Sequence, residues 1–368
     1  MNLSLFFDPV SESEVNKTSD FSTFQNAFYI NTGADLDWKN CDIALIGIND
    51  YRSNPQAEVN DWVAPDVIRN QLYKLNKSSV SYNLCDMGNL RNGKDPQDTE
   101  ERLREVCEAL MENNVIPLII GGTHDFSVGQ YHAYQKLDKL TTVLNVDACI
   151  DMKATDNAPA HVAFLNRILL FEPNYLFNFI LLGYQSYVTD PELLNVFEKL
   201  HFEHYRLGAI REYFEDVEPI VRQSNMVSFD LGAIKIQDAP AQDHNRPFGL
   251  TGEEACRIAW YAGLSEKVNS FAIYEYYPQF DHKEQTANLI ATMIWYFIEG
   301  YYHRIQYESY DSESFMKYNV SVNGIETLVF YKHKYTEKWW LEVPKPHLSI
   351  KSPDQFVVVP CSYNDYLM

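Results

Sequence analysis

Acidic and histidine side chains follow short apolar runs at several places in this sequence. The candidate residues each stand at or just after the carboxyl end of such a run: His124, Asp147, Asp151, Asp230 and Glu275. Buried carboxylates need a positive partner, and a divalent metal ion supplies one. One His with three Asp suits a hard to borderline ion, so the pattern predicts a metal site of the Mn²⁺ type.

Each of these residues alone has a simpler explanation. The Gly121-Gly122 pair before His124 is also typical of a tight turn. Asp147 and Asp230 are also typical of helix starts, where acids are favoured. It is their occurrence together, in this order and each at a strand end, that favours metal binding.

The elements that must position these residues alternate between short apolar runs and helical patterns. Four runs are apolar enough to be buried on both faces, as parallel strands are: Ile116–Ile120, Thr142–Val146, Phe179–Gly183 and Met226–Asp230. Further predicted strands are Ile43–Ile48, Val80–Leu84, His201–Tyr205 and Ser270–Tyr274, and predicted helices are Asp98–Asn114, Gly252–Ala262 and Gln285–Tyr302. The pattern Asp98-x-x-Glu101 predicts a capping box at the first helix. The alternation predicts an α/β fold with an open, mostly parallel central sheet and helices on both faces. Ligands of such sheets bind at the carboxyl ends of the strands.

From about residue 305 the alternation of strand-like and helix-like segments ends. Tyr318–Val322 and Ile325–Tyr331 flank Asn323-Gly324, which predicts a hairpin with a type I′ turn, and a further strand-like run lies at Phe356–Val359. We therefore predict an α/β domain over residues 1–304 and a small β-rich appendage over residues 305–368. Such an appendage is typical of a sheet-edge cover or a subunit contact.

The composition excludes several classes of function. The chain has 51 acidic and 30 basic residues and a formal net charge of −21, which disfavours nucleic-acid binding and favours cationic ligands or metals. No apolar run approaches the roughly 18 residues of a membrane span. The N-terminus lacks a signal-peptide pattern, and the six cysteines form no C-x-x-C pair. These features predict a cytoplasmic protein with free thiols and neither a nucleic-acid nor a membrane partner.

Taken together, the motifs resemble those of the ureohydrolases, the family of arginase, agmatinase and formimidoylglutamase. The family pattern is Gly-Gly-x-His, Asp-x-His-x-Asp, Ser-Phe-Asp-x-Asp-x-x-Asp-Pro and Glu-x-x-Pro. The matching segments are Gly121–His124, Asp147–Asp151, Ser228–Lys235 and Glu275–Pro278, with a Gly-Leu-Thr stretch at Gly249–Thr251. The resemblance covers about residues 40 to 303 and implies a three-layer α/β/α, arginase-like fold. The additional C-terminal part resembles the formimidoylglutamase branch more than arginase.

The resemblance also implies a pair of Mn²⁺ ions. The ligands that it implies for the first ion are all present: His124, Asp147, Asp151 and Asp230. The second ion shares two of those carboxylates and adds two ligands of its own, and both of these are changed, to Cys149 and Gly232. Lys235 replaces a further Asp and would place an ammonium near the second-metal position. This predicts one well-held Mn²⁺ and a second site that is impaired or holds a softer ion such as Zn²⁺ with Cys149. An inert thiol at Cys149 and a solvent-facing Lys235 are the alternatives.

The activity that the resemblance implies is hydrolysis of a C–N bond in a linear amidine or guanidine. Glu275 would hold the cationic amidinium of a small substrate, and His161 would pass a proton to the leaving amine. A surface position in the loop is the alternative for His161. A binding or regulatory protein that keeps the fold without catalysis is the second hypothesis, which the changes at Cys149 and Gly232 favour. The resemblance further implies a homo-oligomer, a trimer or hexamer.

Overall fold

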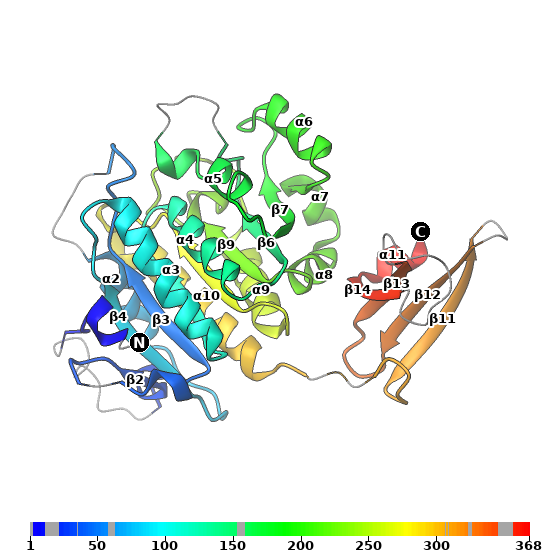
Figure 1. Ribbon diagram of the computed structural model, residues 1–368, viewed down its shortest axis with the longest axis horizontal. Helices are drawn as coiled ribbons and strands as arrows, with labels where there is room; N and C mark the ends of the chain where they lie inside the picture. Colours follow the sequence, from blue (N-terminus) through cyan, green and yellow to red (C-terminus); the bar gives the residue numbers. More distant parts are fainter. Residues whose placement is uncertain are drawn as a thin grey trace.

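The computed structural model describes residues 3–11, 22–34, 36–57, 63–152, 159–305, 307, 309–322, 326–344 and 356–368. These residues form a large β-sheet covered by helices and a small second sheet that lies beside it (Figure 1). The strands of the large sheet are β1 (Phe7–Asp8), β2 (Phe28–Ile30), β3 (Ile43–Ile48), β4 (Leu84–Leu90), β5 (Ile116–Ile120), β6 (Thr141–Val146), β7 (Leu176–Tyr184), β8 (Glu203–Arg206), β9 (Met226–Asp230) and β10 (Ser270–Tyr274). The α-helices around it are α2 (Ala64–Leu72), α3 (Pro96–Glu112), α4 (Ser127–His132), α5 (Leu165–Leu169), α6 (Pro191–Lys199), α7 (Leu207–Glu212), α8 (Val217–Arg222), α9 (Gly252–Leu264) and α10 (Gln285–Tyr302).

The large sheet is almost entirely parallel. Its strand order is β1-β4-β3-β5-β10-β9-β6-β7-β8, with β2 also beside β4, and only the β1–β4 pair is antiparallel among the described strands. The predicted α/β fold class is therefore confirmed. Strands β5, β10, β9 and β6 are consecutive neighbours in the middle of the sheet. Because they are parallel, their carboxyl ends meet at one edge, which is where the candidate site residues follow.

Two apolar cores hold the sheet between its helices. Along β3, Ile43 and Leu45 point into one core, whereas Ala44 and Ile46 point into the other, because successive side chains of a strand alternate between faces. Helices α2, α7, α8, α9 and α10 supply the first core, and α3, α4, α5 and α6 supply the second. This is the three-layer α/β/α architecture that the resemblance implied. Burial on both faces explains why the central strands are continuous apolar runs.

Two local predictions are wrong. The predicted strand Val80–Leu84 is an irregular segment, and the strand runs instead over Leu84–Leu90. Its Tyr82 ring packs edge-on against the rings of Phe24 and Tyr302 at 5.4 and 5.1 Å, so it fills a corner of the core rather than a strand position. The cap of α3 is Asp95 rather than Asp98, because the Asp95 carboxylate accepts from the backbone N–H of Asp98 at 2.8 Å. A proline at the first helical position fits this earlier start.

The small sheet is antiparallel and contains β11 (Phe315–Val322), β12 (Glu326–His333), β13 (Trp339–Pro344) and β14 (Phe356–Cys361) in that order, with α11 (Tyr363–Leu367) after it. It confirms that the C-terminal part is β-rich, while the domain boundary near residue 305 stays a prediction. Strands β11 and β12 pair over their whole lengths, and the predicted Asn323-Gly324 turn between them lies outside the described residues. The sheet contacts α8, where the Arg222 guanidinium donates to the carbonyl of Trp339 at 3.0 Å and covers the Trp340 ring.

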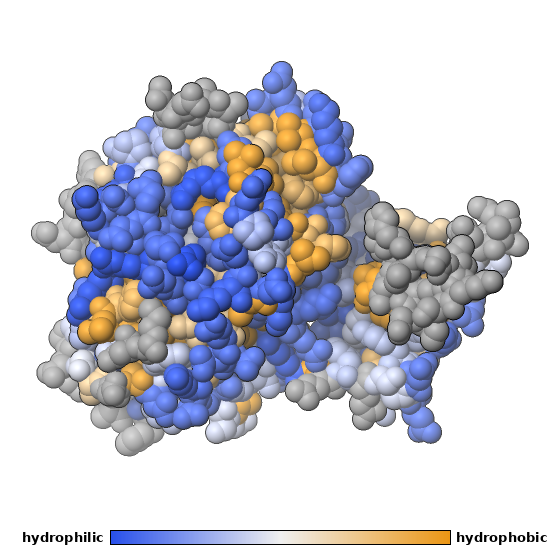
Figure 2. Space-filling model, in the orientation of Figure 1, coloured by the Kyte–Doolittle hydropathy of each residue, from blue (hydrophilic) through white to orange (hydrophobic). Residues whose placement is uncertain are grey.

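The surface over α3 is largely hydrophilic in the view of Figure 2. Charged pairs along that helix account for this, since Arg104 pairs with both Glu101 and Glu108. Apolar surface gathers over the region of α6 in the same view. Within the described part of the chain, no helix is both long and apolar enough to cross a membrane. All six cysteines are free thiols.

Candidate metal centre

The turn after β5 brings His124 to the carboxyl edge of the sheet. Gly121 and Gly122 both have left-handed backbone conformations, with φ of 82° and 74°. A Cβ at Gly121 would lie 2.6 Å from the carbonyl oxygen of Ile48, and one at Gly122 would lie 2.7 Å from the Ile48 side chain. Only glycine fits both the conformation and the space. The pair therefore turns the chain sharply enough for His124 to face the neighbouring strand ends.

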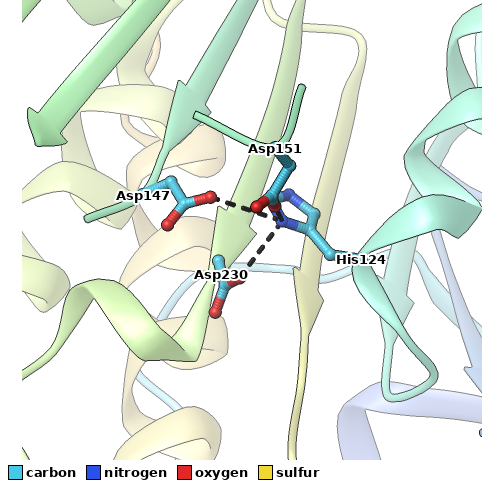
Figure 3. Close-up of side chains that lie close together, drawn as sticks. All are labelled: His124, Asp147, Asp151 and Asp230. Atoms are coloured by element: carbon cyan, nitrogen blue, oxygen red, sulfur yellow. Dashed lines mark ion pairs between the residues drawn. The ribbon is translucent and has the colours of Figure 1, made fainter. Parts of the chain in front are cut away.

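Four side chains converge on one buried point (Figure 3). His124 Nδ1 lies 3.2 Å from Asp230 Oδ2, 3.3 Å from Asp151 Oδ2 and 3.7 Å from Asp147 Oδ2. One donor atom of each residue lies within 4.8 Å of all the others. Asp147 and Asp151 come from the segment after β6, and Asp230 ends β9. The sequence prediction that these four residues lie together is thus met by the geometry.

Two atoms in this cluster lack the partners that burial normally demands. Among the described residues, neither His124 Nδ1 nor Asp147 Oδ2 has a well-aligned hydrogen bond, although the carboxylates of Asp151 and Asp230 lie within ion-pair distance of Nδ1. The other ring nitrogen of His124, Nε2, lies 2.9 Å from Ser228 Oγ. That contact orients the ring so that Nδ1 faces the carboxylates, as the outer partner of a metal-ligating histidine does. Three carboxylate oxygens and one imidazole nitrogen around a shared point suit Mn²⁺, and the orphaned atoms are those that an ion would satisfy.

The cluster concentrates negative charge in a buried place. Burial, together with Asp151 and Asp230, raises the pKa of Asp147 well above its usual range. Burial opposes protonation of His124, but the carboxylates of Asp151, Asp230 and Asp147 outweigh it and raise the pKa of His124 well above its usual range. In the absence of a bound cation a proton on His124 offsets part of this charge. A divalent ion would take over that role.

A positive side chain lies on the other side of these carboxylates. The guanidinium of Arg246 donates from Nη1 to the carbonyl oxygen of Gly232 at 3.2 Å and from Nη2 to Cys149 Sγ at 3.6 Å. Cys149 Sγ in turn lies 3.7 Å from Asp147 Oδ1 and 3.6 Å from Asp151 Oδ1. Burial and these two carboxylates raise the pKa of the Cys149 thiol well above its usual range. The thiol is therefore a neutral donor to the carboxylates at neutral pH.

The sequence left open whether Lys235 is a cation near Gly232, and the cation that contacts Gly232 is Arg246. Lys235 pairs with Asp238, with 3.2 Å between Nζ and Oδ1, and is turned toward that residue. Arg246 lies in the long segment between β9 and α9, where no periodic pattern draws attention to it. The only sequence signal was the loss of a carboxylate at Gly232, which leaves room for a positive group nearby.

Glu275 follows β10 and is joined to the His124 turn. Its backbone N–H donates to the carbonyl of Gly122 at 2.9 Å, and its Oε1 accepts from the backbone N–H of His124 at 2.6 Å. Its Oε2 accepts from the hydroxyl of Tyr277 at 2.5 Å. Burial and the charge of Asp230 raise the pKa of Glu275 well above its usual range. Glu275 also has a left-handed backbone, with φ of 66°, which for a non-glycine residue is a strain typical of functional sites.

His161 lies in a short 3-10 helix, Ala160–Val162, which packs against the His124–Phe126 turn. It is buried, so its alternative as a surface loop residue is wrong. Its Nδ1 lies 2.9 Å from the carbonyl oxygen of Ser53. The hydroxyl of Ser53 donates to Asp125, which follows His124 directly, at 2.7 Å. His161 is thus joined through Ser53 to the segment that carries the metal-facing histidine.

A pocket of about 320 Å³ opens beside Tyr277 and Asn54. Asn54 Nδ2 donates to the Tyr277 hydroxyl at 2.8 Å and to Asp243 at 2.9 Å, so the pocket wall is hydrogen-bonded to the Glu275 carboxylate through Tyr277. Its lining is Asn54, Gln56, Ala57, Pro240, Gln242, Asp243, Asn245, Tyr277, Gln279 and Phe280. The lining carries one carboxylate and no described Lys, Arg or His. Sequence reasoning missed both residues, because Tyr277 occupies an unspecified position of the Glu-x-x-Pro motif and Asn54 lies outside the motifs.

A model of the arginase family matches residues 42–299, which include every one of these site residues. The chain belongs to the arginase family. Curated relatives include the formimidoylglutamase of Staphylococcus haemolyticus, 24% identical over 260 residues that cover 67% of this chain and 81% of the relative. The formimidoylglutamase of Streptococcus pyogenes is 24% identical over 286 residues, which cover 70% and 84% of the two chains.

Solved structures of arginase-family proteins share the fold. The formiminoglutamase of Trypanosoma cruzi, solved with Mn²⁺, superposes with a TM-score of 0.66 at 18% identity and covers 74% of this chain and 97% of its own. The agmatine ureohydrolase of Thermoplasma volcanium gives 0.62 at 22% identity, covering 79% and 98%. This arginase-family chain therefore combines the common fold with a C-terminal sheet that lies beyond the matched residues.

Proposed function

We propose that this arginase-family protein is a metal-dependent hydrolase that cleaves a C–N bond in a linear amidine or guanidine. The convergence of His124, Asp147, Asp151 and Asp230, with two buried atoms left without partners, carries the proposal. These four residues would hold Mn²⁺, which when bound lowers the pKa of water and so supplies a nucleophile at neutral pH.

Glu275 is the proposed anchor of the amidinium. Each of its oxygens accepts one hydrogen bond, from the His124 backbone and from Tyr277, and each keeps a further lone pair for a cationic substrate. The adjoining pocket wall offers the carboxylate of Asp243 and no described basic side chain, so it favours a positively charged ligand. This supports a small cationic amidine or guanidine as substrate.

His161 is the proposed proton carrier for the leaving amine. A carbonyl oxygen only accepts, so the contact with Ser53 fixes the proton of His161 on Nδ1. Nε2 is then the nitrogen that can exchange a proton with the substrate. The short helix that carries His161 packs against the His124–Phe126 turn, and this contact fixes the position of His161 relative to the carboxylate cluster.

The second candidate function, a binding or regulatory protein without catalysis, is favoured by one observation. Where the sequence pattern expects two further metal ligands, Cys149 and Gly232 supply a thiol and a backbone carbonyl, and both are contacted by Arg246. The homo-oligomer, trimeric or hexameric, and the cytoplasmic location stay predictions.

The test is a turnover assay with protein stripped of metal and reloaded with Mn²⁺. Agmatine, arginine, formimidoylglutamate and a guanidino acid are supplied in turn, and released urea, formamide or ammonia is measured. We expect Mn²⁺-dependent turnover on at least one of them and its loss in Glu275→Gln with metal content unchanged. A substrate that binds, by calorimetry, without any turnover would favour the second candidate.

A further inference from the structure

Arg246 lies against the carboxylate cluster at the place where two metal ligands expected from the sequence pattern are missing. We infer that its guanidinium takes the electrostatic place of a second metal ion, so that each chain holds one divalent ion and one built-in cation. The inference rests on the proposed metal site at His124, Asp147, Asp151 and Asp230. It assigns Arg246 the role of a charge-compensating residue rather than a ligand or a group that touches the reacting atoms.

The position of Arg246 is fixed by backbone as well as side-chain contacts. Its N–H donates to the carbonyl of His244 at 2.8 Å, and its own carbonyl accepts from the N–H of Ile236 at 2.9 Å. Its two terminal nitrogens contact Gly232 and Cys149. Arg246 is therefore held both at its backbone and at its guanidinium. A charge that contributes to a site must be held in place in this way.

The charges around the centre favour one ion with Arg246. Three carboxylates, those of Asp147, Asp151 and Asp230, surround the site, and a single divalent ion leaves one negative charge without a partner. A buried charge of this kind is costly unless it is paired. Arg246 is permanently protonated and supplies the missing positive charge. A second divalent ion in its place would give the same carboxylates an excess of positive charge, and Cys149 and Gly232 would offer it only a neutral thiol and a backbone carbonyl.

The space around Gly232 ties that residue to Arg246. A Cβ added at Gly232 would lie 2.9 Å from Asp230 Oδ1, 2.9 Å from the His244 ring and 3.2 Å from Arg246 Nη1. An aspartate side chain at this position would crowd the guanidinium, which would have to shift by a few tenths of an ångström. The absence of a side chain at Gly232 therefore leaves room for Arg246. Relative to the sequence pattern, this chain lacks a metal ligand at position 232 and has a fixed positive charge beside it.

The decisive experiment counts Mn²⁺ ions in matched variants. Metal per chain is measured by elemental analysis after equilibrium dialysis, and electron paramagnetic resonance distinguishes isolated Mn²⁺ from an exchange-coupled pair. The natural sequence should hold one ion with the hyperfine pattern of isolated Mn²⁺. Cys149→His with Gly232→Asp should still hold one ion, because Arg246 remains in place. Adding Arg246→Ala to this pair should give two ions and the spectrum of a coupled pair.

Single variants of Arg246 keep the test informative even if the triple variant does not fold. Arg246→Ala should bind its one Mn²⁺ about tenfold more tightly, because a nearby positive charge is removed. Arg246→Lys should restore the natural affinity to within about threefold, since lysine keeps the charge. Lys235→Ala is the matched control, because it removes a charge that pairs with Asp238 instead, and it should leave affinity unchanged. Weaker binding in Arg246→Ala would mean a purely structural role and would overturn the inference.

The outcomes separate this inference from the proposed function. A natural chain that binds two Mn²⁺ as a coupled pair would overturn the role of Arg246 while leaving the metal site intact. Two ions in the double variant with Arg246 present would do the same. A natural chain that binds no Mn²⁺ at all would instead overturn the proposed metal site on which both proposals depend.

Discussion

The two sides of the carboxylate cluster are built at the same sheet edge but by different means. On one side, His124, Asp147 and Asp151 face a common point, and the orphaned atoms there are His124 Nδ1 and Asp147 Oδ2. On the other, Cys149 and Gly232 offer a neutral thiol and a backbone carbonyl to the Arg246 guanidinium. Asp147 and Asp230 belong to both sides, since they interact electrostatically with His124 and with Arg246.

The difference teaches how a site can lose ligands without losing its charge balance. The first side depends on strand ends, where the parallel sheet fixes each residue, so its geometry survives. The second depends on the long segment between β9 and α9, where a new side chain can replace an ion.

The largest expected effect lies on the ligand side. Asp151→Asn should lower Mn²⁺ affinity by at least about 100-fold, because a neutral amide replaces a charged ligand at a buried ion. Isothermal titration calorimetry measures it. Cys149→Ala is the control on the other side and should change affinity by less than about threefold. Similar losses in both variants would erase the distinction between the two sides.

His161 should affect turnover and leave metal binding alone. His161→Asn should reduce kcat by about 100-fold, a typical loss when a proton carrier is removed, with Mn²⁺ affinity unchanged. Steady-state kinetics and metal titration of the same preparation check this. His282→Asn, at an exposed histidine, serves as the matched control. An unchanged kcat in His161→Asn would mean that the residue only fills space beside Ser53.

The positions that the sequence predicted correctly are those that the sheet itself determines. His124, Asp147, Asp230 and Glu275 each follow a strand buried on both faces, and such strands are recognisable as continuous apolar runs. Once the strands are parallel, the convergence of these residues at one edge follows without any knowledge of the loops. The fold class could be predicted for the same reason.

What could not be predicted depends on segments without periodicity. Arg246 lies in an irregular stretch, so nothing in its neighbours' spacing indicates which strand end it contacts, and Lys235 is much nearer to Gly232 in the sequence. The link from Tyr277 to Glu275 depends on a left-handed backbone at Glu275, which only the folded chain reveals. The segment before β4 was misassigned because Tyr82 serves the core from an irregular backbone.

A smaller effect is expected from pH on the ligand side. The surrounding carboxylates raise the pKa of His124, so a proton competes with the ion for Nδ1. Affinity for Mn²⁺ should therefore fall as pH falls, by about tenfold per unit while one proton is displaced, and level off once His124 is deprotonated. Calorimetry in buffers of different ionisation enthalpy counts the released protons. An affinity that does not change between pH 6 and 8 would contradict this prediction.

The smallest effect is expected at Cys149, where the second side is tested directly. If a Zn²⁺ ion were bound by its thiolate, alkylation by iodoacetamide would be slow with Zn²⁺ and fast after the metal is stripped. With Arg246 in place, we expect labelling rates that differ by less than about twofold between the two conditions. The rates should be low at neutral pH, because burial and the carboxylates of Asp147 and Asp151 raise the pKa of the thiol and keep it protonated, and they should rise with pH. Mass spectrometry of the peptide that contains Cys149 provides the measurement, and Cys107, which is fully buried, gives the background rate. Strong protection by Zn²⁺ would instead make Cys149 a ligand and would give the second side an ion of its own.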